Sequence, residues 1–222
     1  MATRVKASYD ASARRAASVE RRARILAAAR ALFLAHGYAA TTMSAIARES
    51  DVNIDTVYTL VGRKPALFRL LVETAISGVG VPVPAEERDY VRAIQAEASA
   101  EGKLTLYAES LPAIHARLAP LVDTLKAAGA AEPELAALWE EIAERRRGNM
   151  SRLAAELHAT GDLAVDPEVA ADIIWATNAP ELYLLLVQKR GWSSEQYSDW
   201  LRDTWVRGLL QHGPRPSHVR HR

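Results

Sequence analysis

Residues 38–64 are the stretch of this chain that most restricts its fold. Their pattern predicts two short helices, because the threonines at 41–42 and Asn53 are residue types that cap helix N-termini. A tight connection at residues 51–52 joins the two helices. Such a helix-turn-helix can place its second helix in the major groove of DNA, so the stretch indicates a DNA-binding protein.

A longer helix is predicted before this stretch, from Ser18 as N-cap to a stop at His36-Gly37. Apolar residues recur along it at the spacing of one buried helix face, namely Ile25, Leu26, Ala29, Leu32 and Phe33. Residues 1–17 consist largely of Ala, Ser and Arg with little apolar periodicity, so we expect a flexible basic arm there.

The rest of the chain also has helical patterns, apart from a Gly- and Pro-rich linker after Gly78. One long helix begins at Lys64-Pro65, and glycines and prolines divide the remainder into predicted helices at about 85–100, 103–118, 120–128, 133–159, 167–190 and 194–211. No stretch shows the alternation of a strand. We therefore predict an all-α fold with a three-helix DNA-binding head at 18–64, a larger helical domain at 65–212 and a disordered basic tail at 213–222.

Charge is unevenly distributed along the chain. Residues 1–64 hold 11 Lys and Arg against 5 Asp and Glu, whereas residues 65–212 hold 14 against 22. A basic head on an acidic body indicates that the head alone meets a polyanion.

The sequence contains no Cys, which excludes disulfides, thiolate nucleophiles, Cys-based zinc sites and iron–sulfur clusters. No apolar run approaches the roughly 18 residues of a membrane-spanning helix. The N-terminus lacks the apolar segment of a secretory signal. We expect a cytoplasmic protein.

The order of these features resembles the TetR family of transcriptional regulators. The features that carry the resemblance are a basic helix, Gly37-Tyr38, Thr41-Thr42, Ile46-Ala47, Val52, Thr56-Val57-Tyr58, Lys64 and a long apolar helix with Ala66-Leu67. The resemblance implies a homodimer that binds a palindromic operator in double-stranded DNA. It also implies that residues 65–212 form a ligand-binding and dimerisation domain, in which a small molecule moves the two heads out of register.

The resemblance further implies which residues contact DNA. Phosphate contacts are expected from Thr42 and Ser44 at the start of the second helix, from Tyr58 and Lys64 on either side of the groove, and from Arg21 and Arg22 of the first helix. Base edges are expected to meet Asp55, Thr56 and Thr59. Two alternatives are that Tyr58 packs inside the head and that Lys64 is a surface lysine that starts a helix.

The reading helix departs from the family pattern at several positions. The family often has a large or basic residue at Thr59, a histidine at Leu60, an aromatic at Val61 and a proline at Gly62. These differences reduce the polar and aromatic surface of the helix. Our hypothesis is that specificity depends more on Thr56, on Thr59 and on the N-terminal arm, reaching the minor groove; an idle arm is the alternative.

Aromatic and polar residues of the larger domain suggest an effector site. Facing helices with these residues can enclose an apolar cavity with a few polar groups, as small-molecule sites do. The candidate ligand-binding residues are Tyr107, Leu111, His115, Trp139, Met150, Trp175 and Asn178. The alternative is an ordinary core. Pro112 and Pro180 are expected to kink or break their helices.

The last two predicted helices are apolar over more than one face, which is typical of helices with two partners. Residues 173–187 and 197–210 carry these apolar positions. Two such helices from each subunit would form a four-helix bundle across a two-fold axis. The alternative is that both helices are buried within one monomer.

We find no pattern for catalysis, metal or cofactor binding. The acidic and arginine residues between Glu140 and Arg147 fit surface pairs along one helix, and Gly78-Val79-Gly80 lacks the strand and third glycine of a dinucleotide loop. We therefore expect a non-enzymatic repressor released by a small apolar or aromatic ligand. A DNA-binding regulator without an effector, acting through protein partners, is the alternative.

Overall fold

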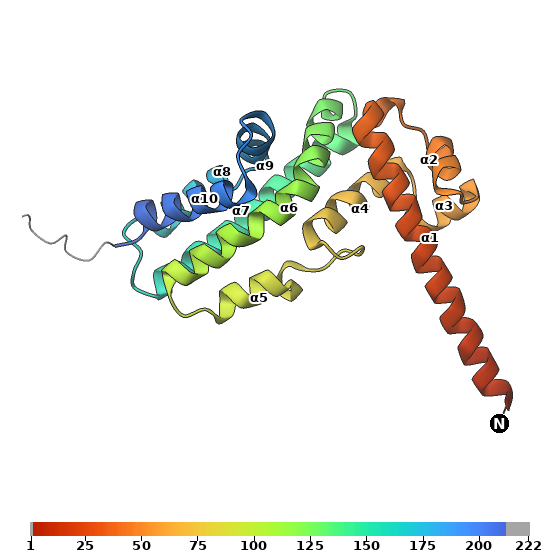
Figure 1. Ribbon diagram of the computed structural model, residues 1–222, viewed down its shortest axis with the longest axis horizontal. Helices are drawn as coiled ribbons and strands as arrows, with labels where there is room; N and C mark the ends of the chain where they lie inside the picture. The colour runs from red at the N-terminus through yellow and green to blue at the C-terminus, as the bar shows by residue number, and fades with distance from the viewer. Residues whose placement is uncertain (1, 212–222) are drawn as a thin grey trace, which may run out of the picture. The chain divides into compact units, whose positions relative to one another are not determined.

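The computed structural model describes residues 2–211, with side chains described from Arg14 onward. In this range Figure 1 shows helices joined by short connections, comprising ten α-helices, one 3-10 turn and one π-helical segment. No strand occurs among these residues, and one isolated bridge joins Leu163 and Leu210. The all-α prediction is confirmed. The predicted tail at 213–222 lies outside the described residues. Within the described range, no helix combines the length and the apolar character that crossing a membrane requires.

Helix α1 runs from Ala2 to Ala40 and is bent at Gly37, where φ is 76°. This left-handed conformation favours glycine, so the predicted stop at His36-Gly37 appears as a kink. The start of the helix differs from the prediction. The sequence predicts a flexible arm over residues 1–17, whereas α1 begins at Ala2 and passes through Ser18. Ala and Arg are strong helix formers, and their intrinsic propensity acts without any apolar periodicity.

The contacts divide the chain into two compact units. The first holds the residues up to Val83 together with Pro120–Trp139, and the second holds Pro84–Ala119 together with the chain from Glu140 onward. The sequence predicts a single boundary at residues 64–65 instead. The division differs because α6 (Ala100–Gly129) and α7 (Pro133–Ala159) each contribute one segment to each unit.

In the first unit, α1 packs against α2 (Met43–Ser50), α3 (Ile54–Val61) and α4 (Lys64–Ser77). Three buried aromatic rings lie at the centre of this packing. The ring of Phe33 is 5.5 Å from that of Tyr38 and 5.2 Å from that of Phe68, measured between centroids. Because these rings come from α1 and α4, they join the bent end of α1 to the helix that follows the helix-turn-helix.

The second unit contains the remaining elements. They are a 3-10 turn at Ala85–Glu87 (η1), α5 (Asp89–Ala96), parts of α6 and α7, α8 (Pro167–Thr177), α9 (Pro180–Tyr183), a π-helical segment at Leu184–Lys189 (η2) and α10 (Ser194–Leu209). One hydrophobic cluster joins most of these helices, and Trp205, Tyr197 and Leu104 are among its fully buried members.

Proline positions explain where the observed helices depart from the predicted ones. Helix α6 continues through Pro112, where a kink or break was predicted, and through Pro120, which was predicted to start a separate helix. The surrounding Ala and Leu residues favour helix strongly enough to keep it continuous. Pro180, in contrast, begins α9 and divides the predicted 167–190 helix, and it lies in a first helical turn, where proline is well tolerated.

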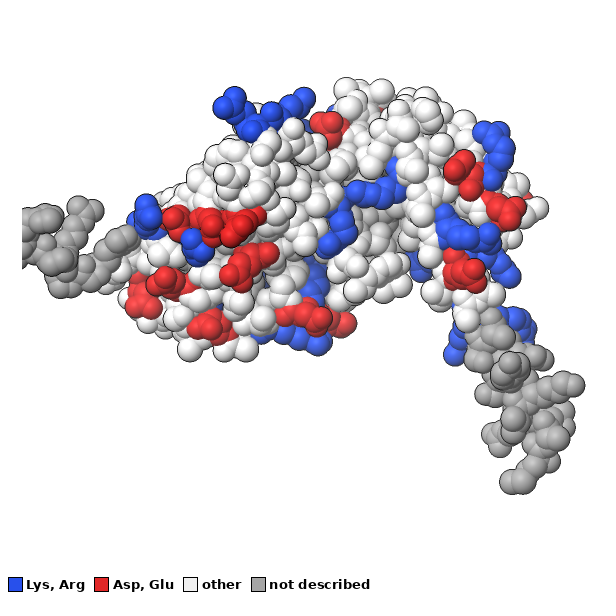
Figure 2. All heavy atoms as spheres, in the orientation of Figure 1, with Lys and Arg blue, Asp and Glu red and all other residues white. Residues whose placement is uncertain are grey.

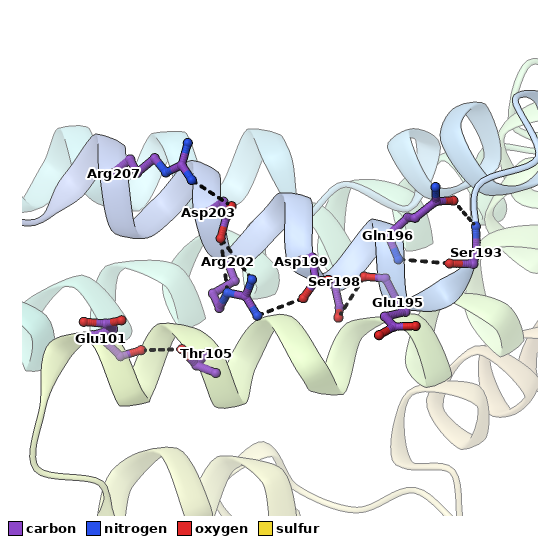
Figure 3. A network of polar contacts seen from close by, with 10 residues as sticks. All are labelled: Glu101, Thr105, Ser193, Glu195, Gln196, Ser198, Asp199, Arg202, Asp203 and Arg207. Carbon is purple, nitrogen blue, oxygen red and sulfur yellow. Dashed lines mark hydrogen bonds and ion pairs between the residues drawn. The ribbon is translucent and has the colours of Figure 1, made fainter.

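Helix α10 is fixed at its start by a capping box. The Ser193 Oγ accepts a hydrogen bond from the Gln196 backbone N–H at 3.0 Å, and the Gln196 side chain accepts one from the Ser193 N–H at 2.9 Å (Figure 3). Two otherwise unpaired donors of the first turn are thereby satisfied.

The two sides of α10 differ in chemistry. Its inner side is fully buried within the same chain and consists of Tyr197, Leu201, Trp205 and Leu209. Its outer side carries a ladder of ion pairs, which Figure 3 shows as Asp199–Arg202, Arg202–Asp203 and Asp203–Arg207. The fully buried positions of α10 thus lie on its inner side, and its predicted contact with a second partner stays a prediction.

Candidate nucleic-acid interface and effector site

Side-chain caps and backbone turns fix the two helices of the helix-turn-helix. The Thr42 Oγ1 accepts from the Ala45 N–H at 3.1 Å, and the Asn53 Oδ1 accepts from the Asp55 N–H at 2.8 Å. Between the helices, Asp51 adopts φ 52°, and the Val52 N–H bonds to the Ala47 carbonyl at 3.1 Å. The caps and the turn predicted from sequence are found at these positions.

The reading helix α3 buries its apolar side and exposes its polar side. Val57 and Val61 are buried against the head, while Asp55 and Thr59 are exposed. Thr56 is half-buried. The Thr59 hydroxyl donates to the Asp55 carbonyl at 2.8 Å, so toward a partner this oxygen acts as an acceptor.

The start of α2 and the end of α3 present the predicted phosphate-binding groups. Thr42 and Ser44 are exposed at the N-terminal turn of α2, where unpaired backbone N–H groups favour an anion. Tyr58 is 46% exposed, so it does not pack inside the head in this structure. Figure 2 shows basic side chains interspersed with acidic ones over these helices of the first unit.

On α1, the two predicted phosphate-binding arginines differ in exposure. Arg21 is exposed, whereas Arg22 is half-buried and its Nε is covered without a hydrogen-bond partner among the described residues. Nearby, the Arg24 guanidinium lies 3.8 Å from the Asp51 carboxylate and links α1 to the turn between α2 and α3. Both partners are substantially exposed, so this pair contributes little stability.

Lys64 is neither a free surface lysine nor a buried one. Its Nζ lies 4.1 Å from the centre of the Tyr38 ring and 3.5 Å from the Ala39 carbonyl oxygen. Partial burial lowers the pKa of Lys64, while the Glu132 carboxylate opposes this shift. Burial, with Glu132 and Glu134 adding to it, raises the pKa of Tyr38 to about 12.

In the second unit, four predicted ligand-binding residues meet in one buried polar cluster. The Asn178 Nδ2 donates to the Tyr107 hydroxyl at 2.6 Å and to the Met150 sulfur at 3.0 Å. Arg146 donates to the Asn178 Oδ1 at 2.5 Å and to the Trp175 carbonyl at 2.6 Å. Its guanidinium also lies 4.6 Å from the centre of the Trp175 ring.

His115 is 3% exposed and belongs to the same interior. Its Nδ1 lies 3.1 Å from the Tyr197 hydroxyl, and its ring is 5.8 Å from that of Tyr183. Burial, together with the Arg146 charge, lowers the pKa of His115 to about 3, so the ring is neutral at ordinary pH. Leu111 is buried in the hydrophobic cluster of this unit.

Trp139 is the predicted ligand-binding residue that the structure places elsewhere. It belongs to the first unit, where the Lys126 ammonium lies 5.3 Å from the centre of its ring. Sequence periodicity along α7 did not reveal this separation, because a single continuous helix carries both Trp139 and Met150.

Arg146 is the residue of the polar cluster that sequence reasoning missed. The prediction that residues 140–147 form surface pairs holds for Glu144 and Arg147, which lie 2.8 Å apart, and is wrong for Arg146. The signal was its helical position, because Ile142, Arg146 and Met150 follow one another at four-residue intervals on the inner stripe of α7.

Over the described residues, no group of three or more His, Asp or Glu side chains lies close enough to hold a metal ion.

The exposed, capped α3 beside the N-terminus of α2 defines the first unit as a helix-turn-helix DNA-binding head. The comparisons with known proteins agree with this class. Residues 25–71 match the family of bacterial regulatory proteins called the tetR family. Among curated proteins, none matches the chain.

Solved structures extend the likeness beyond the head. The SmeT–triclosan complex superposes with a TM-score of 0.66 at 19% identity, covering 91% of this chain and 98% of that chain. NalD, the secondary repressor of the MexAB-OprM multidrug efflux pump in Pseudomonas aeruginosa, has a TM-score of 0.67 at 20% identity and covers 87% of this chain and 98% of its own. At these identities the likeness shows the fold.

Residues 25–71 therefore match the head of the tetR family, and the whole chain shares the fold of the solved TetR-like structures. Members of this family are DNA-binding transcription regulators and not enzymes. The matched head and the shared fold support a DNA-binding transcription regulator.

Proposed function

We propose that this protein is a dimeric repressor that binds a palindromic DNA site and leaves it when a small apolar or aromatic molecule binds inside the second unit. The observation that carries the proposal is the exposed polar side of α3, which Asn53 caps and which Val57 and Val61 hold against the head.

The DNA contacts follow from exposure and chemistry. With α3 in the major groove, Asp55, Thr56 and Thr59 face base edges. The Thr59 oxygen accepts from an adenine or cytosine amino group, because its own proton is held by the Asp55 carbonyl. Asp55 accepts a hydrogen bond from a cytosine amino group, and its negative charge disfavours DNA sequences that lack this donor. Phosphates on either side of the groove are met by Thr42, Ser44, Tyr58, Lys64, Arg21 and Arg22.

The effector site is proposed at the polar cluster of the second unit. Tyr107, Met150 and Arg146 meet at the Asn178 side chain, and Arg146 also bonds to the Trp175 carbonyl. Leu111 and His115 are buried in the same unit. Apolar walls with a few convergent polar groups are the usual composition of a small-molecule site. The SmeT structure, which holds triclosan, supports an aromatic effector for this fold.

The dimer contact is proposed on α8 and the following π-helical segment, with the flank of α10. Val169 is 48% exposed and Leu185 is 52% exposed, whereas the outer side of α10 is charged. Exposed apolar side chains on these elements fit a self-complementary contact across a two-fold axis.

A regulator without an effector, acting through protein partners, is the second candidate. It is favoured by the polar cluster itself, because Asn178 and the Arg146 amino group already have partners within the chain. Such a network can have a purely structural role, in which it holds the core in one arrangement.

Selection of bound duplexes from a random pool tests the DNA-binding part. We expect a palindrome with half-sites about 34–36 Å apart, or a multiple of this spacing. Recovery of sequences without two-fold symmetry would contradict the dimeric arrangement.

Triclosan then serves as the aromatic probe for the effector part. We expect it to release the chain from the selected duplex and to change the fluorescence of the tryptophans in the second unit. Binding without release would favour the second candidate.

A further inference from the structure

Helix α1 extends far beyond the part of it that packs in the head. Its first fully buried residue is Ile25, whereas the helix begins at Ala2. At 1.5 Å per residue, the segment before Ile25 is roughly 34 Å long. Figure 1 shows α1 continuing past α2 and α3, within the same unit. Residues 14–16 of this extension are exposed.

The extension is strongly basic. Residues 2–24 hold seven Lys and Arg against two Asp and Glu. Four of the arginines form two pairs, Arg14-Arg15 and Arg21-Arg22, separated by seven residues. Seven residues are nearly two helical turns, so the pairs share one side of α1 about 10 Å apart. The same geometry puts Glu20 on the other side.

This basic side is the side that faces the head. Seven residues beyond Arg21-Arg22 lie Ala28 and Ala29, which are 7% and 0% exposed and pack in the head. Helix α1 contacts α2 and α3, and the buried residues Ala28 and Ala29 lie on that side. Beyond the packed part of α1, the same side of the helix is therefore occupied by the two arginine pairs.

We infer that this extension is a second DNA-binding element, which lies along the phosphate backbone beside the site read by α3. The inference rests on the proposed DNA-binding function. A duplex strand presents a phosphate for about every 3.4 Å of its axis, so two arginine pairs about 10 Å apart can each reach a different phosphate of one strand.

The helical conformation decides how the extension binds. An α-helix is about 10–12 Å wide with its side chains, whereas the minor groove is about 6 Å wide. The extension therefore does not insert into the minor groove as an unfolded arm would. It contacts phosphates from outside, so it increases affinity for every sequence equally and lengthens the protected segment of DNA.

Arg14→Gln/Arg15→Gln in the full chain tests the phosphate contacts. The measurement is the slope of log affinity against log salt, on a long duplex of random sequence. Because each phosphate contact contributes about 0.9 to the slope, we expect it to become shallower by nearly two units per head. Arg14→Lys/Arg15→Lys keeps both charges and is expected to keep the slope.

Arg152→Gln/Arg207→Gln is the matched control, since it removes the same charge from exposed positions of the second unit. We expect the wild-type slope for this variant. An unchanged slope for Arg14→Gln/Arg15→Gln would overturn the inference and leave the proposed function standing. Failure of the wild-type chain to bind any duplex in dilute buffer would overturn both.

Ala16→Pro tests whether the extension must be helical. Proline breaks the helix directly after the first arginine pair, so the pair loses its fixed position although its charge remains. We expect the salt slope to become shallower, as it does in Arg14→Gln/Arg15→Gln. Ala16→Ser is expected to retain the wild-type slope. If Ala16→Pro retained the wild-type salt slope, the extension would bind as a flexible arm, and the inference of a helical DNA-binding element would be wrong.

Discussion

The Lys64 ammonium lies over the Tyr38 ring, 4.1 Å from its centre, at the point where the kinked end of α1 meets the start of α4. The same ammonium is 3.5 Å from the Ala39 carbonyl oxygen. Lys64 thus links two elements of the head while it remains partly accessible to a phosphate. One residue joins the packing of the head to its proposed contact with DNA.

Lys64→Ala is expected to weaken binding to all DNA sequences and to make the salt slope shallower by about one unit per head. It also removes the contact with Tyr38, at a cost of roughly 0.5–1 kcal/mol in unfolding free energy. Binding and urea unfolding measure the two effects separately. Tyr38→Phe is the control variant, because it keeps both the Lys64 ammonium and an aromatic ring beneath it. An unchanged slope for Lys64→Ala would count against the phosphate contact.

Thr56→Ala is expected to cost about 1 kcal/mol in binding to the selected site and to relax the preference at one base position. Competition between the selected duplex and single-base variants of it measures this. Thr56→Ser separates the two chemistries of the side chain, because it keeps the hydroxyl and loses the methyl group. Equal losses on selected and random duplexes would show that Thr56 does not read a base.

His115 makes the stability of the second unit dependent on pH. Its folded pKa of about 3 lies below the usual value, so the unfolded chain takes up a proton near pH 6.5 while the folded chain does not. The contribution of neutral His115 to the unfolding free energy is therefore fully present above about pH 6.5 and decreases as the pH falls below this value. Between pH 7 and 5, the wild type is expected to lose roughly 2 kcal/mol more than His115→Gln. Urea unfolding at several pH values checks this, and parallel curves would contradict it.

Arg146→Gln is expected to destabilise the second unit by about 1–3 kcal/mol, because it removes charged hydrogen bonds to the Asn178 side chain and the Trp175 carbonyl. Arg147→Gln is the adjacent control. Arg147 is exposed and pairs with Glu144, so its replacement is expected to change stability by at most about 0.5 kcal/mol. Thermal unfolding compares the two variants. Equal effects would show that Arg146 is not part of the core.

The head could be predicted from sequence because its signals are local. The Thr42 and Asn53 caps, the turn at Asp51 and the glycine at position 37 each act within a few residues of their partners. The Val57 and Val61 positions follow from the spacing of a single short helix. Local backbone chemistry alone therefore fixed these elements.

The features that sequence missed depend on longer-range packing or on propensity without a pattern. Arg146 was assigned to the surface because it is charged, although its position on the stripe of Ile142 and Met150 turns it inward. Trp139 and Met150 share one helix and still belong to different units. The extension of α1 has no apolar periodicity, so only the intrinsic helix preference of Ala and Arg indicates it.

Sedimentation of the full chain with the selected duplex tests the central claim most directly. We expect two chains per duplex, and about one chain or none when one half-site is replaced by random sequence, because each head reads one half-site. A complex of one chain with the intact duplex, or equal binding to the altered duplex, would contradict a two-fold assembly that reads DNA through α3.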